Sequence, residues 1–369
     1  MVEFTGKTLL FAFFAVACTI VANAVKTATV SKDVTGHFRT IAAALASIPD
    51  NDEAWEVDIY PGLYVEHLVI NRTGPLTLRG HTNCTESKCQ PTYKDNAVTI
   101  AWNDSATNGT TNEQTSAVWI RTNNFKAYNI NFNQTWGDGW YGQGPQAVAV
   151  TVDADKVGFY HSGFYGWQDT LYVGDKYPGR QYFKECYISG AVDFIFGNAS
   201  AFFDNCTIAY VGTRGFMTAQ KKQYDTPNAT IKSGFVFDKC QVIAANNTRG
   251  SQDNTAEITQ KKHLIEPHMH LRILALGRPW RNHSTVIYMN SFIDRHIQPQ
   301  GWATWYANTL GDYSHIYYAE YNNYGPGSWG PNVVARETLN FTRLINATEA
   351  NQFQLHEWYD DLSWIDGKA

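Results

Sequence analysis

The sequence predicts an all-β protein that folds as a right-handed parallel β-helix, a solenoid with an N-terminal capping helix and a C-terminal strap. A six-residue pattern recurs along the chain: an aromatic residue, two residues, a small residue or cysteine, one residue, and an aliphatic or aromatic residue. Strands that alternate in the register of β-structure are separated by turns rich in glycine and asparagine. Because no helical pattern lies between the copies, a doubly wound sheet is disfavoured.

The copies of this pattern are the units from which the solenoid is built. Most of them are roughly 20–35 residues apart, which is the spacing of stacked repeats. We therefore expect each copy to contribute one coil. The copies are Phe125–Ile130, Phe159–Phe164, Phe183–Ile188, Phe203–Ile208, Phe237–Val242 and Tyr288–Ile293.

The ends of a solenoid must be covered, because a terminal coil has no neighbour on one side. Near the N-terminus the apolar residues of one helical face, followed by Pro49, predict a short amphipathic capping helix. These residues are Phe38, Ile41, Leu45 and Ile48. The tail, about residues 330–369, mixes aromatic and acidic residues without a clear period and is predicted to be a strap. The polar segment Asn103–Ser116 is predicted to be a loop with no chemistry of its own.

Composition and the N-terminal segment indicate a secreted globular protein. Of 369 residues, 44% are hydrophobic, enough for a large core, and the net charge of −5 suggests neither a nucleic-acid nor a membrane partner. Residues 1–24 are predicted to be a signal peptide, because Lys7 precedes an apolar run and Ala22–Ala24 resembles a cleavage site. The mature chain, residues 25–369, is then one extracellular domain. We expect a monomer and, from its many Asn-x-Ser/Thr sequons, a glycoprotein.

The cysteines predict disulfides. One of the six lies in the predicted signal peptide, and an odd number follows it. Cys84 and Cys89 could close a small loop. Cys186, Cys206 and Cys240 occupy the same position of the repeat, and stacked coils about 4.8 Å apart would bring them within reach of a disulfide. We expect Cys186–Cys206 to be bonded and Cys240 to be free, with Cys206–Cys240 as the alternative.

Two aspartates lie in the most apolar stretches of the chain, Asp169 within Trp167–Tyr172 and Asp193 within Val192–Gly197. An isolated carboxylate in such surroundings takes up a proton or costs roughly several kcal/mol. The two are 24 residues apart, about one coil, so equivalent turns of successive coils would place them side by side. Neighbouring carboxylates cannot both ionise readily, so their pKa values should split, as acid/base or nucleophilic chemistry requires.

Arg278 is the cation that we expect to decide which aspartate stays ionised. If its guanidinium bonds Asp193, that carboxylate is a nucleophile, and Asp169 keeps its proton as the general acid. Pro279 and Trp280 would fix the local backbone and shield the guanidinium.

Acyl chemistry also needs hydrogen-bond donors for the developing oxyanion. Gln168, beside Asp169, and Gln146, at the start of a strand one coil earlier, are candidates, because neutral amides suit a transient negative oxygen. Each could also be an ordinary polar residue on a strand, since most polar side-chain hydrogen bonds are structural.

These residues lie in blocks that resemble the signature blocks of the pectin methylesterase (pectinesterase) family, in the same order. Gly62–Glu66 resembles a further N-terminal block and Gly325–Gly327 a late one, so the resemblance runs from about residue 30 to about residue 330. The central blocks are Gln146–Val150, Trp167–Tyr172, Val192–Gly197 and Leu276–Trp280.

The resemblance implies a right-handed parallel β-helix that removes methyl esters from galacturonic acid units of pectin, without a metal or cofactor. It implies that Asp193 attacks the ester carbonyl, while Asp169 protonates the departing methoxide and then activates water. Gln146 and Gln168 would hold the oxyanion, and Arg278 would orient Asp193.

Aromatic residues are the substrate-binding candidates. The resemblance implies that Trp280 and Trp302 line the sugar cleft. Trp167 stands where many relatives carry tyrosine, which would alter subsite preference rather than chemistry. Tyr172 is a further candidate wall, for which core packing is at least as strongly expected.

Other interpretations compete with the esterase. His268 and His270 could bind a metal from one face of a strand, although no third ligand is evident and a surface loop is the simpler expectation. A polygalacturonase could use Asp169 and Asp193 as its acid pair, and a calcium-dependent pectate lyase is a further β-helix enzyme. An inactive carbohydrate-binding relative should have lost a catalytic residue, and this sequence keeps all five. A serine esterase is disfavoured, because no Gly-x-Ser-x-Gly motif is present.

Overall fold

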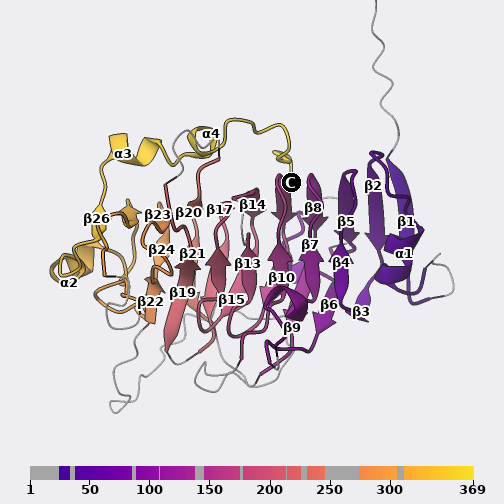
Figure 1. Ribbon diagram of the computed structural model, residues 1–369, viewed down its shortest axis with the longest axis horizontal. Helices are drawn as coiled ribbons and strands as arrows, with labels where there is room; N and C mark the ends of the chain where they lie inside the picture. The colour runs from indigo at the N-terminus through magenta and orange to yellow at the C-terminus, as the bar shows by residue number, and fades with distance from the viewer. Residues whose placement is uncertain are drawn as a thin grey trace, which may run out of the picture.

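The computed structural model describes the chain as an elongated stack of strands (Figure 1). The residues described are 25–33, 38–84, 89–107, 109–137, 145–174, 178–212, 214–225, 231–245, 274–305 and 311–369. The predicted signal peptide, residues 1–24, and the segment His268–His270 lie outside them. Among the described residues, no helix has the length and apolar character needed to cross a membrane.

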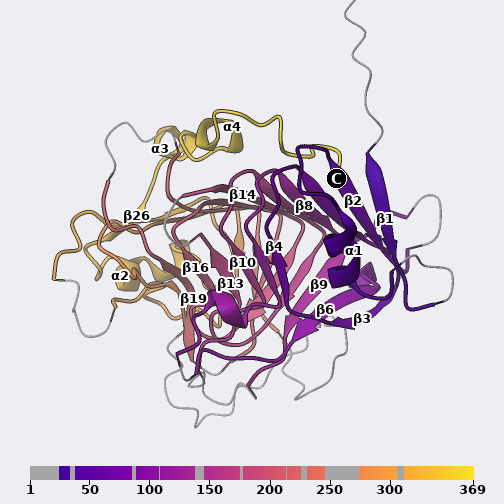
Figure 2. The ribbon, with the colours of Figure 1, turned by 45° about the vertical axis from the view of Figure 1, so that its right-hand side comes forward.

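Three sheets with parallel pairing form the walls of the solenoid (Figures 1 and 2), which confirms the predicted parallel β-helix. Sheet A consists of β1 (Lys26–Val30), β2 (Trp55–Ile59), β5 (Leu76–Gly80), β8 (Phe125–Tyr128), β11 (Val157–Tyr160), β14 (Arg180–Lys184), β17 (Ser200–Asp204), β20 (Gly234–Asp238), β23 (Thr285–Met289), β25 (Tyr317–Tyr321) and β26 (Thr342–Leu344). Sheet B consists of β3 (Gly62–Val65), β6 (Val98–Trp102), β9 (Ile130–Gln134), β12 (Gly163–Tyr165), β15 (Tyr187–Gly190), β18 (Thr207–Tyr210), β21 (Gln241–Ala244) and β24 (Phe292–Ile293). Sheet C consists of β4 (Leu68–Ile70), β7 (Val118–Ile120), β10 (Val150–Val152), β13 (Leu171–Val173), β16 (Ile195–Gly197), β19 (Gly215–Gln220) and β22 (Leu274–Gly277).

The recurring aromatic residue forms a stacked column inside the solenoid. Phe159, Phe183, Phe203, Phe237 and Tyr288 pair in register on successive strands of sheet A. Their ring centres are 5.1, 4.7, 4.4 and 4.3 Å apart along the column, so each coil packs its aromatic ring directly on the next.

The first predicted copy, Phe125–Ile130, is out of register by two residues. Phe159 pairs with Ala127, not with Phe125, and Phe164 pairs with Phe132. In this coil the aromatic ring comes from the end of the repeat, so the equivalent copy is 127–132. This ring, that of Phe132, lies in the same interior but comes from the last position of the copy. A pattern that starts at its first aromatic residue therefore places this copy two residues too early.

The predicted Cys186–Cys206 disulfide is wrong, and so is its alternative with Cys240. Within the described residues these three cysteines are unbonded and fully buried. They do stack in register, but side chains of in-register parallel strands lie about 4.8 Å apart, farther than the ~3.8 Å between the Cβ atoms of a disulfide. Each thiol instead donates to a backbone carbonyl of the preceding coil at 3.4–3.5 Å. The possible bond Cys84–Cys89 is present.

The predicted capping helix is α1 (Ile41–Ser47), which covers the N-terminal coil. Thr40 begins it by accepting a hydrogen bond from the Ala43 N–H at 3.1 Å, the usual role of an N-cap threonine. Ile41 and Ala44 face the core. The other helices in the part of the chain that the structure describes are η1 (Tyr93–Asp95), η2 (Glu113–Thr115), η4 (Gly330–Asn332), α2 (Val333–Arg336), α3 (Ala347–Asn351) and α4 (Leu355–Trp358).

The C-terminal strap follows the outer face of sheet A, where Figure 1 shows α3 and α4 above the strands. Trp358, Tyr359 and Trp364 pack on a row of aromatic and aliphatic side chains from successive strands. The Tyr359 hydroxyl lies 2.7 Å from Gln181 O and 2.8 Å from Ser200 O, so the strap also bonds two adjacent coils.

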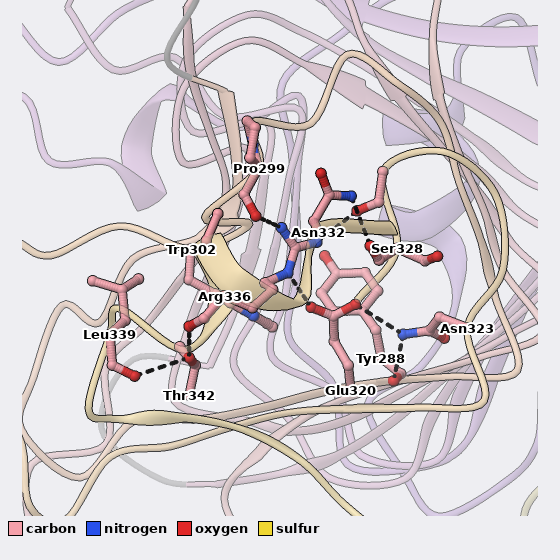
Figure 3. A network of polar contacts seen from close by, with 12 residues as sticks. Tyr288, Pro299, Trp302, Glu320, Asn323, Ser328, Asn332, Arg336, Leu339 and Thr342 are labelled. Atoms are coloured by element: carbon pink, nitrogen blue, oxygen red, sulfur yellow. Dashed lines mark hydrogen bonds and ion pairs between the residues drawn. The ribbon is translucent and has the colours of Figure 1, made fainter. Parts of the chain in front are cut away.

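A buried ion pair closes the C-terminal end of the solenoid (Figure 3). Arg336 donates to Glu320 at 2.7 Å, and both side chains are fully buried. The same guanidinium donates to Gln298 O at 3.1 Å, which fixes the segment 298–303. That segment pairs with the end of β22, because Ala303 N donates to Gly277 O at 3.1 Å. The closing network therefore supports the backbone directly before Arg278.

Candidate active site

Asp169 and Asp193 occupy equivalent turns of successive coils. Each lies two residues before a strand of sheet C, and the register pairs Leu171 with Ile195. Both aspartates have left-handed backbone, with φ of 67° and 49°, which aspartate adopts more readily than most residues. Each backbone N–H donates to a carbonyl of the next coil, at 3.0 and 2.6 Å, so stacking fixes both turns.

Arg278 binds Asp193 with a two-pronged contact. Nε donates to Oδ1 at 2.9 Å and Nη2 to Oδ2 at 2.5 Å, the geometry in which a guanidinium holds a carboxylate most strongly. Both residues are only 6% exposed. The ring centres of Phe216 and Trp305 each lie 4.1 Å from the guanidinium carbon, so these two rings shield the pair.

The two carboxyl groups have different electrostatic surroundings. Burial, reinforced by the negative charge of Asp193, raises the pKa of Asp169 well above its ordinary value, although Arg278 and Asn112 oppose the change. Burial also raises the pKa of Asp193, but the hydrogen bonds and charge of Arg278 counteract it. Arg278 bonds Asp193 directly and acts on Asp169 only through its charge, so this arrangement favours the negative charge on Asp193 and the proton on Asp169, and that division stays a prediction.

Asn112 is a site residue that the sequence analysis missed. It belongs to the segment Asn103–Ser116, to which no chemistry was assigned. Its Nδ2 donates to Asp169 Oδ2 at 3.3 Å across 57 residues of sequence. The only sequence signal is an asparagine in a polar loop, and nothing in that pattern points toward an aspartate so far along the chain.

Gln146 and Gln168 lie on the two coils that lead to Asp193. Gln168 forms a parallel bridge with Val192, and Gln168 O accepts a hydrogen bond from Ala147 N at 3.2 Å. Both glutamines are half-buried. They thus stand on neighbouring turns of the stack that carries the aspartates, and their role as oxyanion donors stays a prediction.

An aromatic wall lies beside the carboxylates and consists of Tyr172, Phe196, Trp280 and Trp305. The Tyr172 and Phe196 rings stack at 4.2 Å, and Trp280 lies 6.2 Å from both Phe196 and Trp305. Lys221 Nζ donates to the Tyr172 hydroxyl at 2.9 Å and lies 5.0 Å from the centre of the Trp280 ring. Tyr172 and Trp280 are therefore brought together with Trp305, which was not predicted.

Trp302 is not a cleft residue, contrary to the expectation. It is 1% exposed and packs in the solenoid core, with its ring centre 4.6 Å from that of Tyr318 and 5.7 Å from that of Tyr288. Its backbone pairs with Gly277 and turns the indole inward. Trp167 is half-buried against the core, and a contact with substrate stays a prediction for it.

Comparisons with known proteins fit this geometry. Residues 27–361 match the Pectinesterase family. The chain belongs to the pectinesterase family. It is 37% identical, over 79% of its length and 77% of the relative's, to a probable pectinesterase A of Neosartorya fischeri. The pectin methylesterase structure from Aspergillus niger aligns with 94% of this chain and 98% of its own, at 32% identity and a TM-score of 0.72. The carrot pectin methylesterase aligns with 93% and 96%, at 27% identity and a TM-score of 0.71.

Membership of the pectinesterase family makes the chain a carboxylic ester hydrolase. Within the described residues, Asp225, His283 and His315 are the group whose ligand atoms are close enough to hold a cation. Asp225 already pairs with the ammonium of Lys222 at 2.6 Å and lies 2.9 Å from His283 Nδ1, so protein groups already occupy its carboxylate. His268 and His270, for which a surface loop was the simpler expectation than a metal site, lie outside the described residues.

Proposed function

We propose that this pectinesterase-family chain hydrolyses the methyl esters of galacturonate units in pectin and releases methanol through an acyl-enzyme. The observation that carries the proposal is the two-pronged ion pair between Arg278 and Asp193, in register with Asp169 one coil away. It supplies an ionised carboxylate and a protonated carboxyl in one water-poor site, which is what nucleophilic attack with acid-assisted departure requires.

In the first half-reaction, the Asp193 carboxylate attacks the ester carbonyl carbon. Arg278 keeps Asp193 ionised and fixes its orientation. Negative charge develops on the carbonyl oxygen, to which the amide groups of Gln146 and Gln168 donate hydrogen bonds. Asp169 transfers its proton to the methoxide oxygen as the carbon–oxygen bond breaks, so that methanol leaves and the substrate acyl group remains on Asp193.

In the second half-reaction, water hydrolyses the acyl-enzyme. Asp169, now a carboxylate, takes a proton from water as the water oxygen bonds the acyl carbon. The bond to Asp193 breaks, and its carboxylate returns to Arg278. One water is consumed, and one methanol and one galacturonate carboxyl group are formed.

The aromatic wall and Lys221 suit a sugar polymer that carries both esters and free carboxylates. Trp280 and Trp305 provide flat apolar faces on which sugar rings can stack. The ammonium of Lys221, held near Tyr172 and Trp280, supplies positive charge beside them. Demethylated units are anionic, so this charge favours pectin over a neutral polysaccharide.

Secretion and action in the extracellular space are part of the proposal. The Cys84–Cys89 disulfide supports an oxidising compartment, as do the predicted signal peptide and the sequons. Plant cell-wall pectin is itself extracellular, so the substrate and the enzyme would meet there.

The experiment is a methanol assay on highly methyl-esterified pectin with polymer length measured alongside. We expect methanol release at constant polymer length. New reducing ends would indicate a glycosidase, and an unsaturated product sensitive to chelators would indicate a lyase. Asp193→Asn should abolish methanol release while the protein stays folded. The control is Asp58→Asn, which should retain methanol release, because Asp58 lies on β2 of sheet A and its carboxylate bonds His81. Wild-type methanol release by Asp193→Asn would refute the assigned nucleophile.

A further inference from the structure

We propose that Asn112 is a positioning residue for Asp169, whose side-chain amide fixes which carboxyl oxygen carries the transferable proton. This inference rests on the proposed function and adds a group to its proton-transfer machinery. The direct observation is the hydrogen bond from Asn112 Nδ2 to Asp169 Oδ2 at 3.3 Å.

The Asn112 side chain does not make the hydrogen bond that is usual for an asparagine at its position. It occupies the N-cap of η2, where an asparagine oxygen ordinarily accepts a hydrogen bond from the first turn. Its side chain makes no such bond to residues 113–115, all of which the structure describes. The amide is thus directed away from its own helix and toward the carboxyl group of Asp169.

The backbone that carries Asn112 is anchored to the catalytic stack. Thr115, which is fully buried, donates to Asn112 O at 2.7 Å and accepts from Val148 N at 3.0 Å. Gln134 Nε2 donates to Thr115 O at 2.8 Å and to Val148 O at 3.0 Å. These bonds fix the loop on the coil that begins with Gln146. The Asn112 side chain therefore has a defined position next to the Asp169 carboxyl group.

The chemistry of an amide decides what this contact can do. Nδ2 can only donate, so it is best met by the carbonyl oxygen of the neutral carboxyl group, and the contact with Oδ2 favours the proton of Asp169 on Oδ1. When Asp169 has given that proton to the departing methoxide, the same N–H donates to a charged oxygen and the bond strengthens. Asn112 thus keeps the Asp169 side chain in one orientation in both protonation states. Asp169 needs this because it acts first as the general acid and then as the general base.

Among the described residues, the charged groups that face Asp169 are Asp193, which favours its neutral form, and Arg278, which favours its ionised form. Asn112 adds a neutral donor that also favours the ionised form without adding net charge. Without this donor, the pKa of Asp169 should rise further, because the carboxylate loses one of the groups that stabilise it.

The experiment compares pH–rate profiles of the wild type, Asn112→Ala, Asn112→Asp and the control Gln114→Ala, with methyl-esterified pectin as the substrate. Asn112→Asp keeps the volume, removes the amide donor and adds a carboxyl group, whose negative charge would also raise the pKa of Asp169. Asn112→Ala removes the donor without adding charge. Gln114 is an exposed amide of the same loop that bonds the Thr111 backbone. We expect both Asn112 variants to move the alkaline limb of kcat/KM up by about one pH unit and to lower kcat about tenfold, with KM changed less than about twofold. Gln114→Ala should match the wild type.

The outcomes separate the two proposals. If wild-type protein releases no methanol, the proposed function fails before Asn112 is tested. If the wild type is active but both folded Asn112 variants keep its alkaline limb, or move it to lower pH, Asn112 does not donate to Asp169 as described. Thermal unfolding of each variant shows whether a loss of kcat reflects unfolding, and Asn112→Asp remains informative if Asn112→Ala disrupts the loop.

Discussion

The centre of the Trp305 ring lies 4.1 Å from the guanidinium carbon of Arg278, and that guanidinium holds Asp193 through two hydrogen bonds. The ring therefore keeps water from an ion pair that orients the proposed nucleophile. Because charge–charge attraction is stronger where water is excluded, the aromatic cover and the two-pronged contact belong to one functional unit.

Arg278→Lys should lower kcat/KM by about 100-fold or more, because an ammonium cannot make both contacts to Asp193 in a fixed orientation. Initial rates of methanol release measure the loss. Arg180→Lys is the matched control, since Arg180 also bonds a carboxylate with more than one nitrogen, that of Asp155, but lies under the strap. Unchanged turnover in Arg278→Lys would show that the two-pronged contact with Asp193 is not needed for activity.

Trp302→Ala and Trp305→Ala should have opposite consequences. Trp302 is buried in the core, so its truncation should destabilise the fold by about 3–5 kcal/mol with normal chemistry in the folded fraction. Truncation of Trp305 should leave the melting temperature nearly unchanged and lower kcat/KM about tenfold, because the Arg278–Asp193 pair loses its cover. Thermal unfolding and methanol release, measured on both variants, test this assignment, and the reverse result would contradict it.

Asp169→Asn should stabilise the fold at neutral pH while abolishing activity. The pKa of folded Asp169 is raised above its unfolded value, so its favourable contribution is complete below about pH 4 and is lost as pH rises through the folded pKa. The uncharged amide of Asp169→Asn has nearly the same size and does not ionise, so the variant does not lose this stability at pH 7. We expect a melting temperature about 1–3 °C higher at pH 7 and little difference near pH 4. A lower melting temperature for the variant at pH 7 would show that burial does not penalise this carboxylate.

The three stacked thiols should be chemically free. Under denaturing, non-reducing conditions, Cys186, Cys206 and Cys240 should each take up an alkylating reagent, whereas the native protein should protect all three, because they are fully buried. Peptide mapping by mass spectrometry measures both states. Detection of a disulfide-linked peptide pair, either Cys186 with Cys206 or Cys206 with Cys240, would contradict this prediction.

The sequence predicts the stack well because a solenoid converts spacing along the chain into position in space. The separation of 24 positions from Asp169 to Asp193 corresponds to one coil, and the register of β13 with β16 places the pair as expected. The same rule fixes the aromatic column from Phe159 to Tyr288, whereas the capping helix follows from the apolar face of its own segment. It works because each coil contacts only its neighbours, so local spacing decides long-range geometry.

The loops between coils do not follow that rule. Trp302 and Trp305 are three residues apart, yet one enters the core and the other covers Arg278, and the segment's pairing with Gly277 decides which. Asn112 reaches Asp169 through anchors at Thr115 and Val148 that no periodicity reveals. Side-chain direction in irregular segments depends on such tertiary bonds, so it could not be read from spacing.

Separate coils of the stack supply the groups of the proposed chemistry: Gln146 precedes β10, Gln168 and Asp169 precede β13, Asp193 precedes β16, and Arg278 follows β22, two coils beyond Asp193. The architecture is modular, and a coil added at either end of the solenoid would lengthen the polymer-binding surface without disturbing these elements. A coil inserted between Asp169 and Asp193 would separate them by a further strand spacing, about 4.8 Å, and uncouple acid from nucleophile. Natural or engineered variation in length should therefore accumulate at the ends of the stack and be absent from its middle.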